Sequence, residues 1–232
     1  MFQTTVAALT DKGRKRRNNE DWTVHFEPSS MDVRTQNGCL YIVADGVGGA
    51  AKGEQASQYA AQKLLYDYYH HTDLPPAERL SYAMRQAGNE IYKYAEEQGA
   101  GRMATTMVAA VILANKLIVA NVGDSRAYAL IPAGGDEEGR LEQLTRDHSV
   151  AKRLEEIGQI TREEADAFVG ADEDVDFWVQ IQGQFVQRFK GAHHYFFNDH
   201  RNSCDSKVLA MICHAKAKSR WFKHRCAAIW CP

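Results

Sequence analysis

The feature that most constrains this chain is a run of apolar residues that ends on a carboxylate. Residues 40–44 read LYIVA, and the chain then reaches Asp45, with glycine at three of the next four positions. An apolar run of this kind predicts a strand over 38–44 that is buried on both faces. Asp45 at its end is compatible with a turn, a phosphate-binding loop or a metal ligand, so other parts of the chain have to decide.

The order of the remaining patterns favours an α+β fold. Alternating or β-rich runs predict further strands over 4–9, 21–26, 105–113, 116–122, 125–131 and 139–145. Apolar residues that recur at i and i+4 predict two long helices, over 53–69 and 76–98. Shorter helical patterns predict two further helices, over 148–158 and 161–168. Thr161 and Glu164 form a capping box for the last of these. Because helices do not alternate one-to-one with strands, antiparallel sheets with helices packed outside are expected rather than a parallel βαβ sheet.

The glycines after Asp45 do not indicate a nucleotide loop. Gly46 to Ala51 matches G-x-G-x-x-A, but a dinucleotide fingerprint needs a second parallel strand directly after its helix, and here another helix follows. A phosphate-binding P-loop needs Gly-Lys-Ser/Thr, whereas Lys52 precedes Gly53 and Glu54 follows it. A turn or a metal ligand remains for Asp45.

Three further polar clusters lie at strand ends: RRNNED at 16–21, NVGDSRA at 121–127 and LTRDHS at 144–149. Each one alone is typical of a turn or a solvated face. Together with VADGVGG at 43–49, and in this order, they resemble the metal-dependent protein phosphatase family, the protein phosphatase 2C type, and most of all its compact bacterial members. The resemblance covers about residues 4–168.

The resemblance implies a fold and a chemistry. The family fold is an antiparallel β-sandwich flanked by helices on both sides (α-β-β-α), and loops at one end hold two divalent ions, Mn²⁺ or Mg²⁺. Asp45 corresponds to the aspartate that bridges both ions, and Gly46 to the glycine whose carbonyl is a ligand. Hard cations take such oxygen ligands, and a pair of ions activates water for attack on phosphorus, so no protein nucleophile is required.

Other site residues follow from the same resemblance. Arg16 corresponds to the arginine that binds the substrate phosphate, and its guanidinium can meet two phosphate oxygens. Asp21 corresponds to an acid at the metal site, with Glu20 beside it in a supporting place. Asp124 matches the acid that can hold a third, weaker ion. Thr105 and Thr106 match a GTT segment in which Ala104 replaces the glycine, and Val47 stands where some relatives carry a histidine.

The chain changes character after Phe168. Residues 1–168 carry 19 Lys+Arg and 24 Asp+Glu, a net charge of −5, and residues 169–232 carry 9 and 6, a net charge of +3. The second part holds four of the five cysteines and only one leucine. We therefore expect 1–168 to form a phosphatase-type domain that lacks its C-terminal third, and 169–232 to be an unrelated tail without the final strands of the second sheet.

Two aspartates that the family places in its C-terminal third, in SDG and DN segments, do not occur in the chain. A shifted reading frame, a disordered segment and a genuine, diverged tail are the open interpretations of 169–232. A zinc site among its cysteines and histidines fits no standard spacing.

The bulk properties exclude some classes of function. The net charge of −2 does not indicate a nucleic-acid partner. The chain has no apolar run of about 18 residues and no signal peptide at its start, which predicts a cytoplasmic protein that does not enter a membrane.

The resulting prediction is a monomeric serine/threonine phosphatase that hydrolyses phosphate monoesters on phosphorylated proteins. Two alternatives stay open, a non-catalytic phosphatase-like binding module and a nonfunctional truncated fragment. The reason is that one of the two metal ions would keep Asp45 as a ligand but lack two carboxylates that the family supplies.

Overall fold

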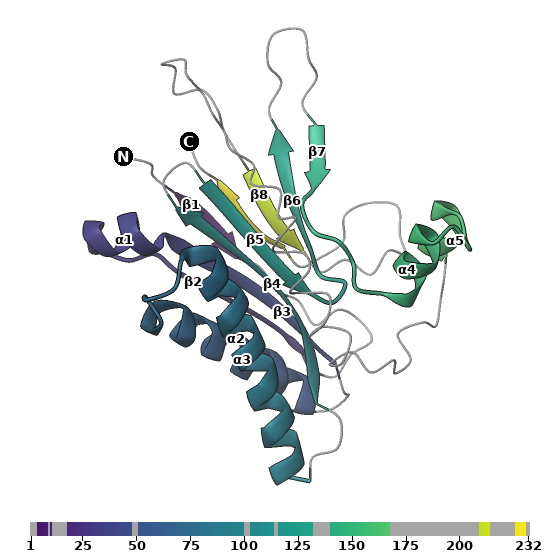
Figure 1. Cartoon of the computed structure of the whole chain (residues 1–232), viewed down its shortest axis with the longest axis horizontal. Helices are drawn as coiled ribbons and strands as arrows, with labels where there is room; N and C mark the ends of the chain where they lie inside the picture. Colours follow the sequence, from purple (N-terminus) through teal and green to yellow (C-terminus); the bar gives the residue numbers. More distant parts are fainter. Residues whose placement is uncertain are drawn as a thin grey trace, which may run out of the picture.

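Two antiparallel sheets form the centre of the molecule (Figure 1). This computed structural model describes residues 4–8, 10, 18–47, 51–99, 103–113, 116–131, 140–167, 209–213 and 226–230. One sheet has the strand order β2-β3-β4-β5 and the other β1-β9-β8-β6-β7. The expected antiparallel α+β architecture is confirmed.

The first sheet contains the apolar strand that leads to Asp45. Its strands are β2 (Asp21–Phe26), β3 (Cys39–Val47), β4 (Ala104–Leu113) and β5 (Lys116–Val122). All residues of β3 except Val47 are buried, as expected for a strand covered on both faces. Because successive side chains alternate, Leu40, Ile42 and Ala44 belong to one core cluster, and Cys39, Tyr41 and Val43 to another.

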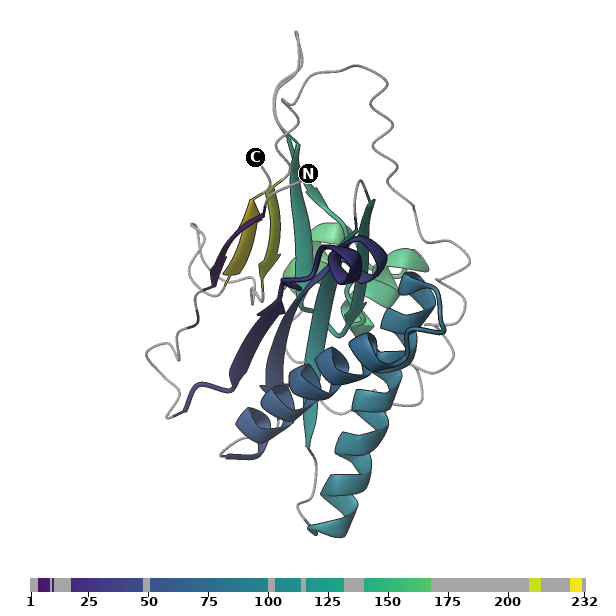
Figure 2. The same cartoon turned by 90° about the vertical axis from the view of Figure 1, so that its left-hand side faces the viewer.

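Two long helices cover one face of this sheet. They are α2 (Ala51–His70) and α3 (Pro76–Glu97), which lie against each other and, through α2, against β3 (Figure 2). The i and i+4 stripes that predicted them are buried, with Ala60, Leu64 and Tyr68 of α2 fully inaccessible. Tyr68 donates its hydroxyl hydrogen to the carbonyl of Asn37, which ties α2 to the segment before β3.

The second sheet packs on the other face of β3 and β4, where Ala127 and Val6 join the second core cluster. Its strands are β1 (Thr5–Ala8), β6 (Arg126–Ile131), β7 (Arg140–Gln143), β8 (Leu209–Cys213) and β9 (Cys226–Trp230). β8 pairs with β6, and β9 bridges β8 and β1.

The sequence led us to expect that 169–232 lacks the final strands of the second sheet, whereas β8 and β9 pair within that sheet. Both are five-residue runs, LAMIC and CAAIW, without an alternation of apolar and polar residues, and their pairing with β1 and β6 supplies the main-chain partners that a lone strand lacks. The other residues of 169–232 lie outside the described part of the chain, so the interpretations of that tail stay predictions.

Three short helices complete the described structure. α1 (Met31–Asn37) was not predicted, because its two apolar residues, Met31 and Val33, are two positions apart and form no i, i+4 stripe. α4 (Val150–Glu156) and α5 (Arg162–Ala167) follow β7 and confirm the later helical patterns. The capping box is confirmed as well: the amide of Glu164 donates to Oγ1 of Thr161, and the amide of Thr161 donates to Oε2 of Glu164. No helix in the described ranges is both long enough and apolar enough to cross a membrane.

The packing of α2 on the sheet generates a stability prediction. Leu64→Ala removes a side chain that is 0 % exposed and is expected to lower the free energy of unfolding by roughly 2–5 kcal/mol, since a cavity remains. The same substitution at Leu141 on β7, which is 44 % exposed, serves as the control and should cost no more than about 0.5 kcal/mol. Urea unfolding followed by circular dichroism measures both. Equal losses would show that α2 does not pack as described.

Candidate functional site

Two carboxylates face each other where β2 begins and β3 nears its end. Asp21 is the direct register partner of Asp45. Directly opposed residues of an antiparallel pair project from the same face of the sheet, and alternation from Tyr41 and Val43 assigns that face to the second sheet. Asp21 is 6 % exposed and Asp45 is 2 % exposed. The candidate site therefore lies at one end of the core between the sheets.

Two buried carboxylates side by side are unfavourable unless a positive charge joins them. Like charges directly opposite in a sheet repel, and burial adds the cost of desolvation. A divalent cation removes both costs, and carboxylate and carbonyl oxygens are the ligands that hard cations take. The residues present thus fit a divalent cation, because Asp21, Asp45 and the main chain of the adjacent Gly46 offer the oxygen donors that such an ion would take.

This set is small. Within the described ranges, no three His, Cys, Asp or Glu side chains gather closely enough to form a metal cluster of their own. The side chain of Glu20 lies against Gly53 of α2: a Cβ on that glycine would lie 3.1 Å from Cδ of Glu20. Hard cations take about six oxygens, so the remaining ligands have to come from water, main-chain carbonyls or other parts of the chain.

Side-chain hydroxyls of β4 fix the main chain on both sides of Asp45. The amide of Asp45 donates to Oγ1 of Thr106 at 3.2 Å, and Oγ1 of Thr105 lies within hydrogen-bond distance of two carbonyls, 2.9 Å from that of Asp45 and 2.8 Å from that of Thr106. Both threonines are buried. The Cα of Asp45 is consequently held by three strands, since β2 and β4 both pair with β3 at this position.

The main chain of β3 and the start of α2 come unusually close together at Gly46. A Cβ on Gly46 would lie 1.9 Å from the carbonyl oxygen of Gly53, a distance no side chain can occupy. Only glycine permits this approach. The glycine after Asp45 therefore serves the contact between strand and helix and leaves its own carbonyl next to the carboxylate pair.

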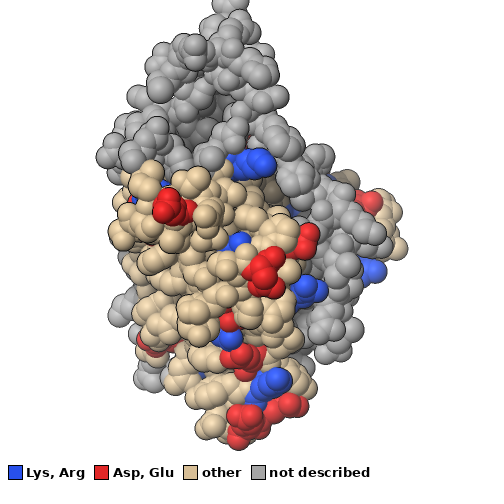
Figure 3. Space-filling view, turned by 60° about the vertical axis from the view of Figure 1, so that its left-hand side comes forward, with Lys and Arg blue, Asp and Glu red and all other residues tan. Residues whose placement is uncertain are grey.

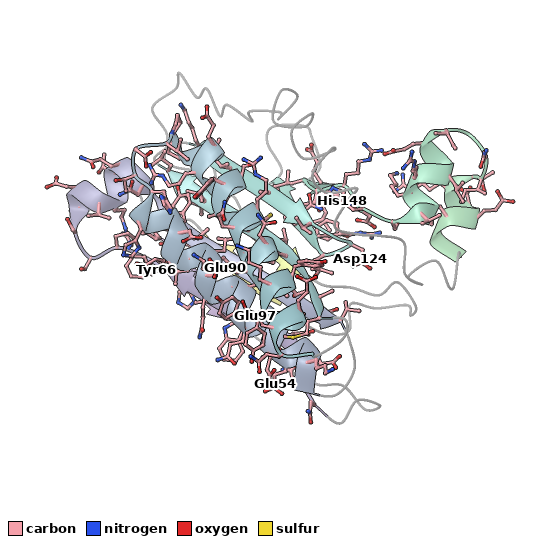
Figure 4. All side chains as sticks on the ribbon, turned by 60° about the horizontal axis from the view of Figure 1, so that its bottom comes forward. Glu54, Tyr66, Glu90, Glu97, Asp124 and His148 are labelled. Carbon is pink, nitrogen blue, oxygen red and sulfur yellow. The ribbon has the colours of Figure 1, made fainter. Side chains whose placement is uncertain are left out.

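Asp124 lies in the turn between β5 and β6, on the same side of the molecule as His148 (Figure 4). Gly123 before it has a φ of 96°, which favours glycine. The 146–148 segment holds this turn: the amide of His148 donates to the carbonyl of Gly123 at 2.9 Å, and Nδ2 of Asn121 donates to the carbonyl of Arg146 at 2.8 Å. The turn is thus fixed from two directions.

An ion pair fastens the 144–149 loop to β6. Nε of Arg126 donates to both carboxylate oxygens of Asp147, and Nη2 donates to Oδ2 as well. These hydrogen bonds raise the pKa of Arg126 above its ordinary value. The Asp147 carboxylate is therefore engaged by Arg126.

The structure brings together four of the site residues that the sequence predicted and connects a fifth. Glu20, Asp21, Asp45 and Gly46 lie at the junction of β2 and β3. Asp124 is linked to them through its neighbour, because the hydroxyls of Ser125 and Thr106 are hydrogen-bonded. Arg16 lies outside the described residues.

The sequence analysis did not single out Gly53, Ser57 or Ser125. Small residues such as glycine and serine add nothing to an apolar periodicity in the sequence. Their part in the site is therefore visible only from their contacts in the fold. For Ser57 the sole hint was its position one turn into a helix that begins just after Asp45.

Comparison with known proteins decides the family. Residues 9–164, more than half of the chain, match the sequence profile described as Protein phosphatase 2C. The chain belongs to the protein phosphatase 2C family. The resemblance carried by VADGVGG and VGDSRAY is thereby confirmed.

Curated relatives come from bacteria. The chain is 38% identical over 161 residues to the serine/threonine phosphatase stp of Listeria welshimeri, covering 67% of this chain and 59% of that protein. It is 32% identical over 165 residues to the protein phosphatase PhpP of Streptococcus pneumoniae, covering 70% of this chain and 62% of that protein. The matches thus span less than two-thirds of these phosphatases.

Solved structures agree on the fold. The catalytic domain of the serine threonine protein phosphatase PstP in complex with 2 manganese ions is similar, with a TM-score of 0.57, 31% identity, and coverage of 72% of this chain and 65% of that one. A Mycobacterium tuberculosis serine/threonine phosphatase, PstP/Ppp, is 20% identical with a TM-score of 0.65 and matches 100% of this chain and 98% of that one, which shows a shared fold.

The close approach at Gly46 generates the second prediction. Gly46→Ala is expected to lower the free energy of unfolding by at least about 3 kcal/mol, because its Cβ cannot fit without separating β3 from α2. Gly99→Ala is the control: its Cβ would meet no atom within 4 Å, so only its positive φ should cost about 1–2 kcal/mol. Chemical denaturation compares them. If Gly46→Ala is as stable as Gly99→Ala, the described contact between strand and helix is wrong.

Proposed function

We propose that this chain is a metal-dependent serine/threonine protein phosphatase that hydrolyses phosphate monoesters on phosphorylated proteins. The observation that carries the proposal is the register pairing of two buried carboxylates, Asp21 and Asp45, beside the carbonyl of Gly46. Its membership of the protein phosphatase 2C family and the names of its relatives support the same activity.

The site residues then take distinct roles. Asp21, Asp45 and Gly46 would hold the Mn²⁺ or Mg²⁺ ions of the site, and Asp124 would hold a further, weaker one. When bound, such ions lower the pKa of water and neutralise charge on phosphoryl oxygens. The protein's own contribution is to fix these ligands before substrate arrives: hydroxyls of Thr105 and Thr106 hold the main chain of Asp45 in place.

Arg16 binds the phosphate in this proposal. A guanidinium that donates two hydrogen bonds to phosphate oxygens orients the phosphorus toward the metal site. Val47 is 53 % exposed directly after Gly46 and has no proton to give. The general-acid place that some relatives fill with a histidine is therefore unfilled at position 47.

One face of the molecule shows how the charged side chains of the described residues are distributed. On the face in Figure 3, the described acidic and basic side chains are interspersed and form no continuous basic surface. Nucleic-acid binding generally requires such a surface. The cytoplasmic location and the monomeric state expected from the sequence remain predictions, and light scattering on the purified chain tests the second.

An alternative follows from the sequence of the tail. The chain contains neither an SDG nor a DN segment, so two expected carboxylates of the metal site are absent. A non-catalytic relative would bind a phosphorylated protein and not hydrolyse it.

Hydrolysis of p-nitrophenyl phosphate with added Mn²⁺ tests the proposed activity. Asp45→Asn is expected to lower the rate at least about 100-fold, because loss of a direct ligand should cost no less than loss of a supporting one. Asp73→Asn changes the same residue type at an exposed turn and should leave the rate unchanged. EDTA should abolish the activity, and phosphoserine and phosphothreonine peptides should release phosphate.

Two results would argue against the phosphatase. A folded Asp45→Asn variant with full activity would remove Asp45 from the mechanism. A folded wild-type chain without any activity would favour the binding module, which calorimetry with a phosphoserine peptide then tests.

A further inference from the structure

We propose that Ser57 is a positioning residue of the metal site, which acts through the main-chain carbonyl of Glu20 to keep Asp21 opposite Asp45. This inference rests on the proposed function, because it assigns Asp21 and Asp45 to the metal. Ser57 lies on α2, in the second turn of the helix, and is itself no ligand.

The contact is short and fully buried. Oγ of Ser57 lies 2.6 Å from the carbonyl oxygen of Glu20 and 3.1 Å from the carbonyl oxygen of Glu54, and the serine is 0 % exposed. A hydroxyl has one hydrogen to donate. The shorter distance assigns it to Glu20, whereas the contact with Glu54 is the ordinary approach of a serine to the preceding turn of its own helix.

Three elements meet at this one carbonyl. The amide of Gly46, at the end of β3, also donates to the carbonyl of Glu20, at 2.9 Å. The carbonyl therefore joins the start of β2 to both β3 and α2. A carbonyl oxygen has two lone pairs, and both are used here.

The peptide unit in question is the one that leads into Asp21. Its carbonyl is held by Ser57 and Gly46, and its amide hydrogen, on Asp21, is donated to Oδ1 of Asn19 at 3.2 Å. Rotation of this peptide would turn the Cα of Asp21 and move its carboxylate relative to Asp45. This peptide unit thus has two donors to its carbonyl, Ser57 and Gly46, and one acceptor for its amide, Asn19. Of these three partners, Ser57 is the one that comes from outside the strands and their adjoining segment.

Gly53 determines how closely α2 can approach Glu20 and Gly46. A Cβ on Gly53 would lie 3.1 Å both from Cδ of Glu20 and from the carbonyl carbon of Gly46. Gly53 thus allows α2 to approach closely enough for Ser57, one turn later, to reach Glu20. The first turns of α2 form a support for the carboxylate pair, independent of the hydroxyls on β4.

Manganese binding separates this role from a merely structural one. Free Mn²⁺ is measured by electron paramagnetic resonance during titration of the full chain, at a temperature where circular dichroism shows each variant folded. Ser57→Ala is expected to weaken Mn²⁺ binding about tenfold, which is about 1.4 kcal/mol. Ser81→Ala, at a buried serine of the neighbouring α3, should leave Mn²⁺ affinity unchanged.

A second pair of variants separates the effect of the hydroxyl from the effect of side-chain size. Ser57→Thr and Ser57→Val add the same branched shape, but only threonine keeps the hydroxyl. Threonine is expected to bind Mn²⁺ about tenfold more tightly than valine. This pair decides the question if Ser57→Ala does not fold.

The inference is overturned if Ser57→Ala, or the valine variant, binds Mn²⁺ as tightly as its hydroxyl-bearing counterpart. It is equally overturned if Ser81→Ala loses as much affinity, or if the valine variant fails to fold, since the role of Ser57 is then structural alone. A folded wild-type chain that binds no Mn²⁺ overturns the proposed function together with it, whereas wild-type binding without an effect at Ser57 overturns only the inference.

Discussion

The pairing of Asp21 with Asp45 is the constraint on which the rest of the site depends. Two carboxylates that are directly opposite and buried repel each other and have lost water, and groups of opposite charge have to offset these costs. An arrangement that is costly for the fold alone is typical of a functional site. A divalent cation turns the same pair into a favourable one, and this gives the strand register a chemical purpose.

The surrounding structure opposes that repulsion with main-chain hydrogen bonds. Thr105 and Thr106 hold Asp45 from β4, and Ser57 holds the peptide before Asp21 from α2. These hydroxyls come from elements that also contribute to the apolar core, so the packing of the helices and the geometry of the site are coupled. The contact of Gly46 on β3 with Gly53 on α2 joins the helix to the site most directly.

Much of the fold could be predicted from the sequence, and the exceptions have physical reasons. The apolar run before Asp45, the alternation in 21–26 and the i, i+4 stripes identify β3, β2, α2 and α3 because long elements repeat their pattern. α1 has no i, i+4 stripe and β8 and β9 have no alternation, so these elements depend on tertiary contacts. Asp45, Gly46 and Asp21 could be found because family motifs carry them, whereas the contact of Ser57 with Glu20 joins residues 37 positions apart and leaves no local signal.

A crystal structure grown with MnCl₂, with data collected at the manganese absorption edge, tests the central claim most directly. The account predicts an anomalous peak beside the paired carboxylates, about 2.0–2.6 Å from a carboxylate oxygen of Asp45 and from the carbonyl oxygen of Gly46. A fully folded chain in which manganese binds elsewhere, or in which Asp21 and Asp45 face each other with no anomalous peak between them, would contradict it.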